Sequence, residues 1–284
     1  MPELPEVETV RRGLVPLLDG RTVRSVQVLH PRPVRRHLGG PQDFATTLVG
    51  RRIGCPRRRG KYLWLPFADG DALVVHLGMS GQLRSDRPQA PLLPSSRVLV
   101  DLDDERQLRF VDQRMLGGMW LSPGGAELPD ELRRIALDPF DPHFDPVPVA
   151  RAMSRRRSGV KRLLLDQSVV SGIGNIYADE ALWRARLHYG TPACTLSVRR
   201  LANLLRQAQA VMAESLEQGG TSFDGLYVDV HGRSGYHERS LEAYGRAGQP
   251  CSRCGRLLVR EAFANRSSYR CPRCQRLSTR VRAL

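Results

Sequence analysis

Four of the six cysteines form two close pairs near the end of the sequence. Cys251 and Cys254 are separated by two residues, as are Cys271 and Cys274, and sixteen residues lie between the pairs. Two such pairs are typical of a zinc ribbon, in which four thiolates surround the metal as a tetrahedron. A module this small has little core of its own, so we expect one structural Zn²⁺ to hold its fold. Redox use of one pair is the less favoured alternative.

The first residues offer a second kind of chemistry. Pro2 follows the initial methionine and Glu3 follows Pro2. Removal of the methionine would give Pro2 a free secondary amine, and an α-amine titrates near neutral pH. Such an amine can attack a sugar C1′ carbon and form an iminium, with Glu3 beside it to move protons. The alternative is that both residues only lead into a helix, as proline often does.

The two lysines are unusual in this composition. Only Lys61 and Lys161 are lysines, whereas the other 42 basic residues are arginines. An amine can lose or shuttle a proton, but a guanidinium stays protonated. Each lysine is therefore a candidate for proton transfer, and survival of two lysines in an arginine-rich composition is the alternative.

The charge balance indicates a polyanionic partner. The 284 residues carry a formal net charge of +15, and arginine suits phosphate because its planar fork donates hydrogen bonds in pairs. A basic protein without such a partner is the alternative. No apolar run has the length of a membrane span, and the acidic start lacks the apolar core of an export signal. We therefore expect a cytoplasmic protein with no membrane partner.

A glycine-containing turn supplies a candidate phosphate site. Residues 169–180 (VVSGIGNIYADE) join two expected helices, and Asn175 is suited to cap the second one. Exposed amides at a helix N-terminus bind anions, although a tight helical hairpin would use the same residues. The basic run Arg155, Arg156 and Arg157 lies just upstream and is either a further phosphate site or a solvated face.

The pattern of elements predicts an α+β chain. Residues 4–18 have helical spacing, and strands are expected at 22–29, 62–66, 72–77, 97–102, 107–111 and 119–122, as in a β-sandwich or barrel. Residues 138–148 have the composition of a linker. Helices are then expected at 149–156, 160–167, 175–186 and about 197–217. We predict four parts: a β-domain (1–136), a linker (137–148), a helical domain (149–247) and the cysteine module (248–284).

Together these residues resemble the bacterial formamidopyrimidine-DNA glycosylase family. The resemblance runs through essentially the whole chain in family order, and the arginine-rich variant is most similar to actinobacterial members. The motifs that carry it are 2–9 (PELPEVET), 11–14 (RRGL), 59–63 (RGKYL), 76–81 (HLGMSG), 112–114 (DQR), 166–180 (DQSVVSGIGNIYADE) and 271–275 (CPRCQ).

The resemblance implies a fold and a reaction. The fold would be an N-terminal β-sandwich with a leading helix, then a helix-two-turn-helix domain with a zinc ribbon. The reaction would be excision of oxidised purines from duplex DNA, followed by strand cleavage by β,δ-elimination. Pro2 would be the Schiff-base nucleophile, Glu3 would protonate the sugar ring oxygen, and Lys61 would transfer a proton during elimination. Arg266 would assist δ-elimination.

The same resemblance implies the DNA contacts of a monomeric enzyme. Asn175 and Arg266 would clamp the phosphates beside an extruded nucleotide, while Met79 and Arg114 would enter the helix as the base leaves. Lys161 would be a DNA-contacting or a structural lysine. The full set of expected DNA contacts is His76, Met79, Arg97, Arg114, Leu116, Arg156, Arg157, Lys161 and Asn175.

Three features depart from the family pattern. Leu116 stands where the family usually has a bulky aromatic residue, so it would act as an apolar wedge that stacks less well. Arg97 is preceded by two serines in a strand where the family often has a histidine. Residues 222–236, which would cover the extruded base, contain uncommon residues such as Asp224 and His231.

Two other functions remain as alternatives. Relatives that act on oxidised pyrimidines usually begin Pro-Glu-Gly, whereas this chain has Pro2-Glu3-Leu4. A non-catalytic DNA-binding protein would be indicated by loss of Pro2, Glu3 or Lys61, and all three are present.

Overall fold

The computed structural model describes residues 2–221, 229–232 and 240–277. The chain divides into two compact units, each of which combines two segments of the sequence. Unit 1 comprises residues 1–134 and 216–236, and unit 2 comprises residues 135–215 and 237–284. Within the described residues, no helix is long and apolar enough to cross a membrane.

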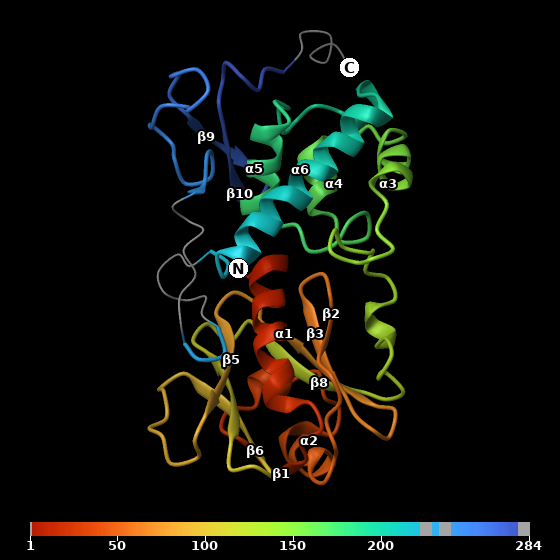
Figure 1. Ribbon diagram of the computed structural model, residues 1–284, viewed down its shortest axis with the longest axis vertical. Helices are drawn as coiled ribbons and strands as arrows, with labels where there is room; N and C mark the ends of the chain where they lie inside the picture. The colour runs from red at the N-terminus through yellow and green to blue at the C-terminus, as the bar shows by residue number, and fades with distance from the viewer. Residues whose placement is uncertain (1, 222–228, 233–239, 278–284) are drawn as a thin grey trace. The chain divides into compact units, whose positions relative to one another are not determined.

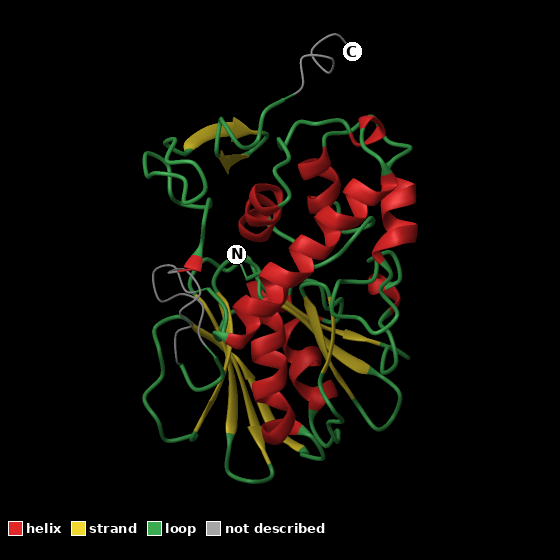
Figure 2. Cartoon of the chain, turned by 45° about the horizontal axis from the view of Figure 1, so that its top comes forward, coloured by secondary structure: helices red, strands yellow, loops and turns green. Residues whose placement is uncertain are grey.

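Unit 1 contains two antiparallel four-stranded sheets, seen as the two groups of yellow strands in Figure 2. One sheet has the order β1-β6-β7-β5 and the other has the order β2-β3-β4-β8. The strands are β1 (Val23–Val28), β2 (Arg57–Arg59), β3 (Tyr62–Pro66), β4 (Ala72–His76), β5 (Gly81–Asp86), β6 (Ser96–Leu102), β7 (Gln107–Asp112) and β8 (Gly118–Ser122). Two 3₁₀ turns, η1 (Arg32–Val34) and η2 (Asp130–Leu132), complete the unit with two helices.

The leading helix α1 (Leu4–Leu18) supplies one face of the core of unit 1. Its buried side chains Val7, Val10, Leu14 and Leu18 recur every three or four residues and pack with side chains from both sheets. Helix α2 (Gly40–Leu48) adds Phe44 and Leu48 to the same core. The sequence pattern did not predict α2, β2 or β5, because each is short and has few periodic apolar positions.

Unit 2 is helical and ends in a two-stranded ribbon. Its helices are α3 (Pro146–Met153), α4 (Val160–Leu165), α5 (Asn175–Arg184) and α6 (Val198–Glu217), with the 3₁₀ turn η3 (Ala193–Thr195) before α6. The last two residues of α6 group with unit 1. Strands β9 (Val259–Phe263) and β10 (Arg266–Arg270) pair in antiparallel register (Figure 1).

These observations confirm the α+β class, with a β-sandwich behind a leading helix and a helical part that carries the ribbon. The start of the first helix of unit 2 differs from expectation. The final residues of the expected linker form the first turn of α3, because Asp145 caps the helix by accepting the amide of Val147 and Pro146 is tolerated at the first helical position. The boundaries of the four predicted parts stay a prediction.

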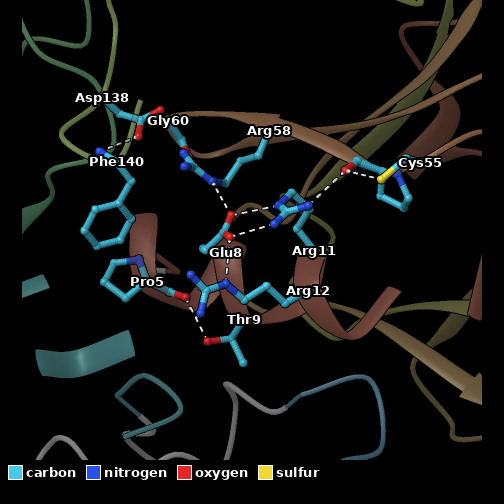
Figure 3. A network of polar contacts seen from close by, with 11 residues as sticks. Pro5, Glu8, Thr9, Arg11, Arg12, Cys55, Arg58, Gly60, Asp138 and Phe140 are labelled. Atoms are coloured by element: carbon cyan, nitrogen blue, oxygen red, sulfur yellow. Dashed lines mark hydrogen bonds and ion pairs between the residues drawn. The ribbon is translucent and has the colours of Figure 1, made fainter. Parts of the chain in front are cut away.

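The first turns of α1 are fixed by a cluster of charges around the buried carboxylate of Glu8 (Figure 3). The carboxylate of Glu8 accepts bonds from Arg11 at 2.8 Å, Arg12 at 2.9 Å and, from strand β2, Arg58 at 3.0 Å. Burial alone would raise the pKa of Glu8, but the bonds and charges of Arg11 and Arg58 outweigh burial and lower this pKa to about 2. The cluster therefore joins α1 to β2 and favours the charged form of Glu8.

Substitution Glu8→Gln should weaken the fold in a pH-dependent way. Because the pKa of Glu8 is lower in the folded chain, the charge stabilises the fold above about pH 4.5, and this contribution disappears as pH falls towards 2. We expect Glu8→Gln to lower the free energy of unfolding by on the order of 1–2 kcal/mol at pH 7, after allowance for solvent screening, and by less below pH 4.

Urea unfolding at several pH values measures this difference. The matched control is Glu127→Gln, because Glu127 also pairs with an arginine of β2, Arg57, but is 87% exposed. The control should change stability little. Equal unfolding free energies for Glu8→Gln and the wild type at pH 7 would contradict the prediction.

Candidate active site and metal centre

The N-terminal end of α1 is held by the carboxylate of Glu6. Glu3 and Glu6 form a reciprocal capping box, in which Glu6 accepts the amide of Glu3 at 2.8 Å. The other oxygen of Glu6 accepts the amide of Thr221 at 2.9 Å and its hydroxyl at 2.8 Å. Pro2 and Glu3 are buried at this end. Glu6 thus ties the residues that precede α1 to the point where the chain returns to unit 1.

Lys61 lies in the tight turn between β2 and β3. The turn depends on Gly60, whose φ of +55° favours glycine, and Lys61 is only 7% exposed. Arg58 donates to the carbonyl of Gly60 at 3.0 Å while it pairs with Glu8 of α1. The contacts of Arg58 with Glu8 and Gly60 thus hold the turn that contains Lys61 against the first turns of α1.

His76 is positioned as a neutral side chain at the end of β4. Burial, together with the charges of Arg36, Lys61 and Arg35, lowers the pKa of His76 to about 4. Its Nδ1 atom accepts the amide of Gly78 at 3.2 Å, and its ring lies 4.7 Å from that of Tyr62. At neutral pH this side chain can offer a hydrogen bond to a ligand but no positive charge.

The turn at residues 113–117 is built around a fully buried carboxylate. Asp112 accepts the hydroxyl of Ser80 at 2.6 Å and the amide of Gly117 at 2.8 Å. Ser80 in turn accepts the amide of Arg114 at 2.9 Å. Gly78 approaches this turn so closely that a Cβ atom there would lie 2.4 Å from the Gly117 nitrogen. The turn is therefore preformed, with Arg114 and Leu116 exposed on it.

Two arginines of the segment at η1 hold the same turn from another side. Arg32 donates to the carbonyl of Met115 at 3.2 Å, and Arg35 donates to the carbonyl of Gly117 at 2.9 Å. These bonds support a backbone in which Met115 has a φ of +51°, a conformation that is costly for a residue with a side chain.

The structure brings three of the expected wedge residues together. A guanidinium nitrogen of Arg114 lies 3.7 Å from the sulfur of Met79, and Leu116 is 45% exposed on the same turn. Arg97 donates to the carbonyl of Asp112 at 3.1 Å and to that of Pro94 at 3.0 Å. Arg97 therefore already has partners within unit 1.

In unit 2, Lys161 is buried and pairs with a carboxylate. It is fully buried, its ammonium lies 2.7 Å from Asp179, and it donates to the carbonyl of Ser267 at 3.1 Å. Burial raises the pKa of Asp179, against the opposing effect of Lys161 and of bonds from Ser268 and Tyr269. These buried contacts favour the structural alternative for Lys161, and its role as a DNA contact stays a prediction.

Asn175 does not cap helix α5. The capping position belongs to Gly174, and Asn175 is the first helical residue. Its side-chain amide donates to the carbonyl of Ser267 at 3.0 Å, while its Oδ1 atom is buried and has no hydrogen-bond partner among the residues that the structure describes. The expected cap was wrong because β10 offers this amide a carbonyl from a distant part of the sequence.

The contact at Ser267 brings two expected phosphate ligands close together. Ser267 follows Arg266, the first residue of β10, which is exposed and bonds through its Nε atom to Asn265 at 3.1 Å. The side chain of Asn175 therefore contacts the residue next to Arg266, at the point where α5 meets β10. Arg156 and Arg157 are also exposed, in the segment between α3 and α4.

The four cysteines form the expected metal centre. The sulfur atoms of Cys251, Cys254, Cys271 and Cys274 all lie within 4.8 Å of one another, and Cys254 is 3.5 Å from both Cys271 and Cys274. A tetrahedron with zinc–sulfur bonds of about 2.3 Å has edges of about 3.8 Å, so these distances fit one Zn²⁺. Gln275 supports the centre by accepting the amide of Cys271 and donating to the carbonyl of Leu187.

Several supporting residues were missed in the sequence. Glu6, Asp112 and Asp179 fix candidate site residues, and Glu180 accepts three amides of residues 242–244 at 2.8–3.0 Å. The spacing from Glu3 to Glu6 is that of a capping box and could have been recognised. The partners of Asp179 and Glu180, and the partner Ser80 of Asp112, lie too far away in sequence for any local signal.

Three family models match the chain in succession. The formamidopyrimidine-DNA glycosylase N-terminal domain matches residues 1–119, and the formamidopyrimidine-DNA glycosylase H2TH domain matches residues 135–225. A zinc finger found in FPG and IleRS matches residues 248–277. Together they define a glycosylase fold of two domains with a zinc module.

Curated relatives are similar over the same length. A formamidopyrimidine-DNA glycosylase of a Nocardioides species is 58% identical over all of this chain and 97% of its own. That of Streptomyces coelicolor is 56% identical over 97% of this chain and 98% of its own. The chain belongs to the formamidopyrimidine-DNA glycosylase family.

Solved structures agree with this assignment. The Lactococcus lactis Fpg bound to DNA containing an abasic site has a TM-score of 0.87 at 31% identity, and a MutM bound to DNA containing carbocyclic 8-oxo-G has a TM-score of 0.88 at 32% identity. Both alignments cover 97% of this chain and 100% of the other.

Loss of the metal should unfold the ribbon. We expect Cys274→Ala to lower bound zinc from one equivalent to a small fraction and to lower the melting temperature, because zinc binding supplies much of the folding free energy of such modules. Metal analysis and circular dichroism measure the two effects. The control is Cys194→Ala, which removes an exposed cysteine outside the cluster. A full equivalent of zinc in Cys274→Ala would contradict the assignment.

Proposed function

We propose that this chain is a bifunctional DNA glycosylase and abasic-site lyase of base excision repair. It removes oxidised purines, 8-oxoguanine and formamidopyrimidines, from duplex DNA. The observation that carries the proposal is the family match over the whole chain together with Pro2 and Glu3 placed at the start of α1, which Glu8 and Arg58 connect to the turn of Lys61. Solved relatives are described as complexes with DNA that contains an abasic site, carbocyclic 8-oxo-G or Fapy-dG.

Pro2 supplies the nucleophile in this proposal. Once the initial methionine is removed, its amine attacks C1′, the bond from C1′ to the base breaks, and an iminium joins Pro2 to the opened sugar. Glu3 protonates the sugar ring oxygen. Lys61 transfers protons during elimination, as an amine in a largely buried turn can do. The first elimination breaks the strand on the 3′ side of the sugar. Arg266 assists the second elimination on the 5′ side.

The preformed turn at residues 113–117 supports extrusion of the damaged base. A base inside a duplex has to leave the stack before it can react, at a cost of a few kcal/mol. Apolar and basic side chains that enter the gap hold it open. Met79, Arg114 and Leu116 take this role, with Arg114 facing the unpaired cytosine. Because Asp112 and Ser80 already fix the turn, little ordering is required when DNA binds.

Phosphate contacts are assigned to residues of both units. In unit 2, Asn175 and Arg266 clamp phosphates, with Arg156 and Arg157 nearby in sequence to α4. In unit 1 the contacts are His76, as a neutral hydrogen-bonding group, and Arg97. We propose a monomer that works in the cytoplasm and associates with the nucleoid through DNA, with the four-part organisation predicted from the sequence.

Borohydride trapping tests the proposal. The iminium on Pro2 is reduced to a stable bond, so we expect a covalent adduct with a duplex containing 8-oxoguanine opposite cytosine. A matched protein with one extra residue before Pro2 holds that nitrogen in a peptide bond and should form none. Absence of an adduct with the wild type would overturn the enzyme assignment. Stronger trapping with a thymine-glycol duplex would overturn the purine preference.

Leu116 should limit the strength of the wedge. An aromatic ring stacks on bases with about 1–3 kcal/mol per base, so we expect Leu116→Phe to bind a duplex with an abasic-site analogue several-fold more tightly. Fluorescence anisotropy measures this affinity. The control is Leu93→Phe, at another exposed leucine. Equal affinities for the two variants would remove Leu116 from the wedge.

A further inference from the structure

Unit 2 has a basic hollow that the proposed reaction does not use. Its volume is about 320 Å³, and it lies between the C-terminal end of α5 and the N-terminal half of α6. The lining residues are Ala185, Leu187, Arg199, Arg200, Asn203 and Arg206. The four polar residues are exposed and share one face of α6, and below they are called the α6 stripe.

The three arginines of the α6 stripe have no acidic partner among the described residues. Other arginines of unit 2 have acidic partners. Arg184 forms a bidentate ion pair with Glu214 at 2.6 Å, and Arg270 forms an ion pair with Glu261 at 2.6 Å. No carboxylate lines the hollow. Three guanidiniums therefore share one concave surface without compensation, which favours binding of an anion.

The position of these charges is unfavourable for the helix itself. Arg199 and Arg200 lie in the first turn of α6, which contains no acidic residue. Positive charge at a helix N-terminus opposes the helix dipole and typically costs 0.3–1 kcal/mol per residue. Local conflicts of this kind are expected where a residue serves function rather than stability.

The α6 stripe is separate from the candidate phosphate clamp of unit 2. Asn175 begins α5, whereas Ala185 follows the last residue of this helix. Ten helical residues span about 15 Å, which is more than a Debye length at physiological salt. A phosphate held at Asn175 therefore does not neutralise the α6 stripe.

We propose that the α6 stripe is a second DNA-binding surface, which contacts the phosphate backbone of a duplex segment other than the one at the candidate active site. The proposal rests on the proposed function, which makes DNA the ligand of this chain. Arg199 and Arg206 are seven residues apart, or about 10 Å along the helix, and a DNA strand has one phosphate per 3.4 Å of its axis. The stripe thus matches about three phosphates.

The lining favours DNA over an acidic protein. Protein interfaces depend on buried aromatic or apolar anchors, whereas this hollow offers three guanidiniums, one amide and only Ala185 and Leu187 as apolar residues. It has no aromatic ring on which a base could stack. The α6 stripe therefore contacts the phosphate backbone and does not distinguish base sequence. It allows the protein to bind a neighbouring duplex segment while the first segment occupies the candidate active site.

A two-duplex capture assay tests the second surface. The protein is bound to an immobilised short duplex that contains an abasic-site analogue, and a fluorescent undamaged duplex is added at several salt concentrations. The variant Arg199→Gln/Arg200→Gln/Arg206→Gln is compared with Arg24→Gln/Arg134→Gln/Arg151→Gln, which removes the same charge from exposed positions elsewhere. Direct titration with the undamaged duplex alone accompanies each capture.

We expect the wild type and the control to retain the second duplex. In the stripe variant, direct titration should show a log–log salt slope lower by about 2.7, which corresponds to three lost phosphate contacts, and capture should be lost. Thermal unfolding should be no earlier than in the wild type, since the removed charges oppose the dipole. Borohydride trapping at the first duplex should be unchanged.

Three results would overturn the second surface: no capture by the wild type, equal loss in the control, or preferential capture of polyglutamate over DNA. Failure of the proposed function is distinct from these. If the proposed function fails, borohydride forms no adduct with the wild type. Titration with the undamaged duplex then still tests the second surface, because it compares the DNA affinity of the stripe variant with that of the control variant.

Discussion

A carboxylate that is removed from water has to be surrounded by donors or positive charge, and this constraint positions the candidate site. Glu6 meets it with the amides of Glu3 and Thr221, and Asp112 meets it with Ser80 and Gly117. In each case one donor is local, and another comes from a segment remote in sequence: Thr221 for Glu6 and Ser80 for Asp112. Because an unsatisfied buried charge costs several kcal/mol, these bonds hold the segments in one arrangement.

Buried carboxylates also need donors in unit 2, where their bonds attach the ribbon to helix α5. Asp179 is satisfied by Lys161, Ser268 and Tyr269, and Glu180 by the amides of residues 242–244. Adjacent residues of α5 thus fix β10 and the segment before the ribbon. The zinc centre holds the ribbon internally, whereas Asp179 and Glu180 hold it against the helix. The position of Arg266 therefore depends both on the metal, which holds the ribbon together, and on the two carboxylates, which hold the ribbon against α5.

Sequence reasoning reached the features that depend on local spacing. The leading helix, the cysteine centre and most strands were predictable, because periodicity and CxxC spacing are local. The short helix α2 was not, since only Phe44 and Leu48 are buried in it. The cap expected at Asn175 failed because a carbonyl of β10, some ninety residues later, takes its amide. Long-range bonds of this kind leave no periodic signal in the sequence.

The two lysines show what the choice between lysine and arginine means in this chain. Arg109 is as buried as Lys161, but its planar fork is divided among Gln107 and the carbonyls of three loop residues. Lys161 instead places one compact charge between Asp179 and Ser267. Its retention therefore needs no proton transfer. Lys61 lies in the turn made by Gly60, and its amine can lose a proton, which a guanidinium cannot do.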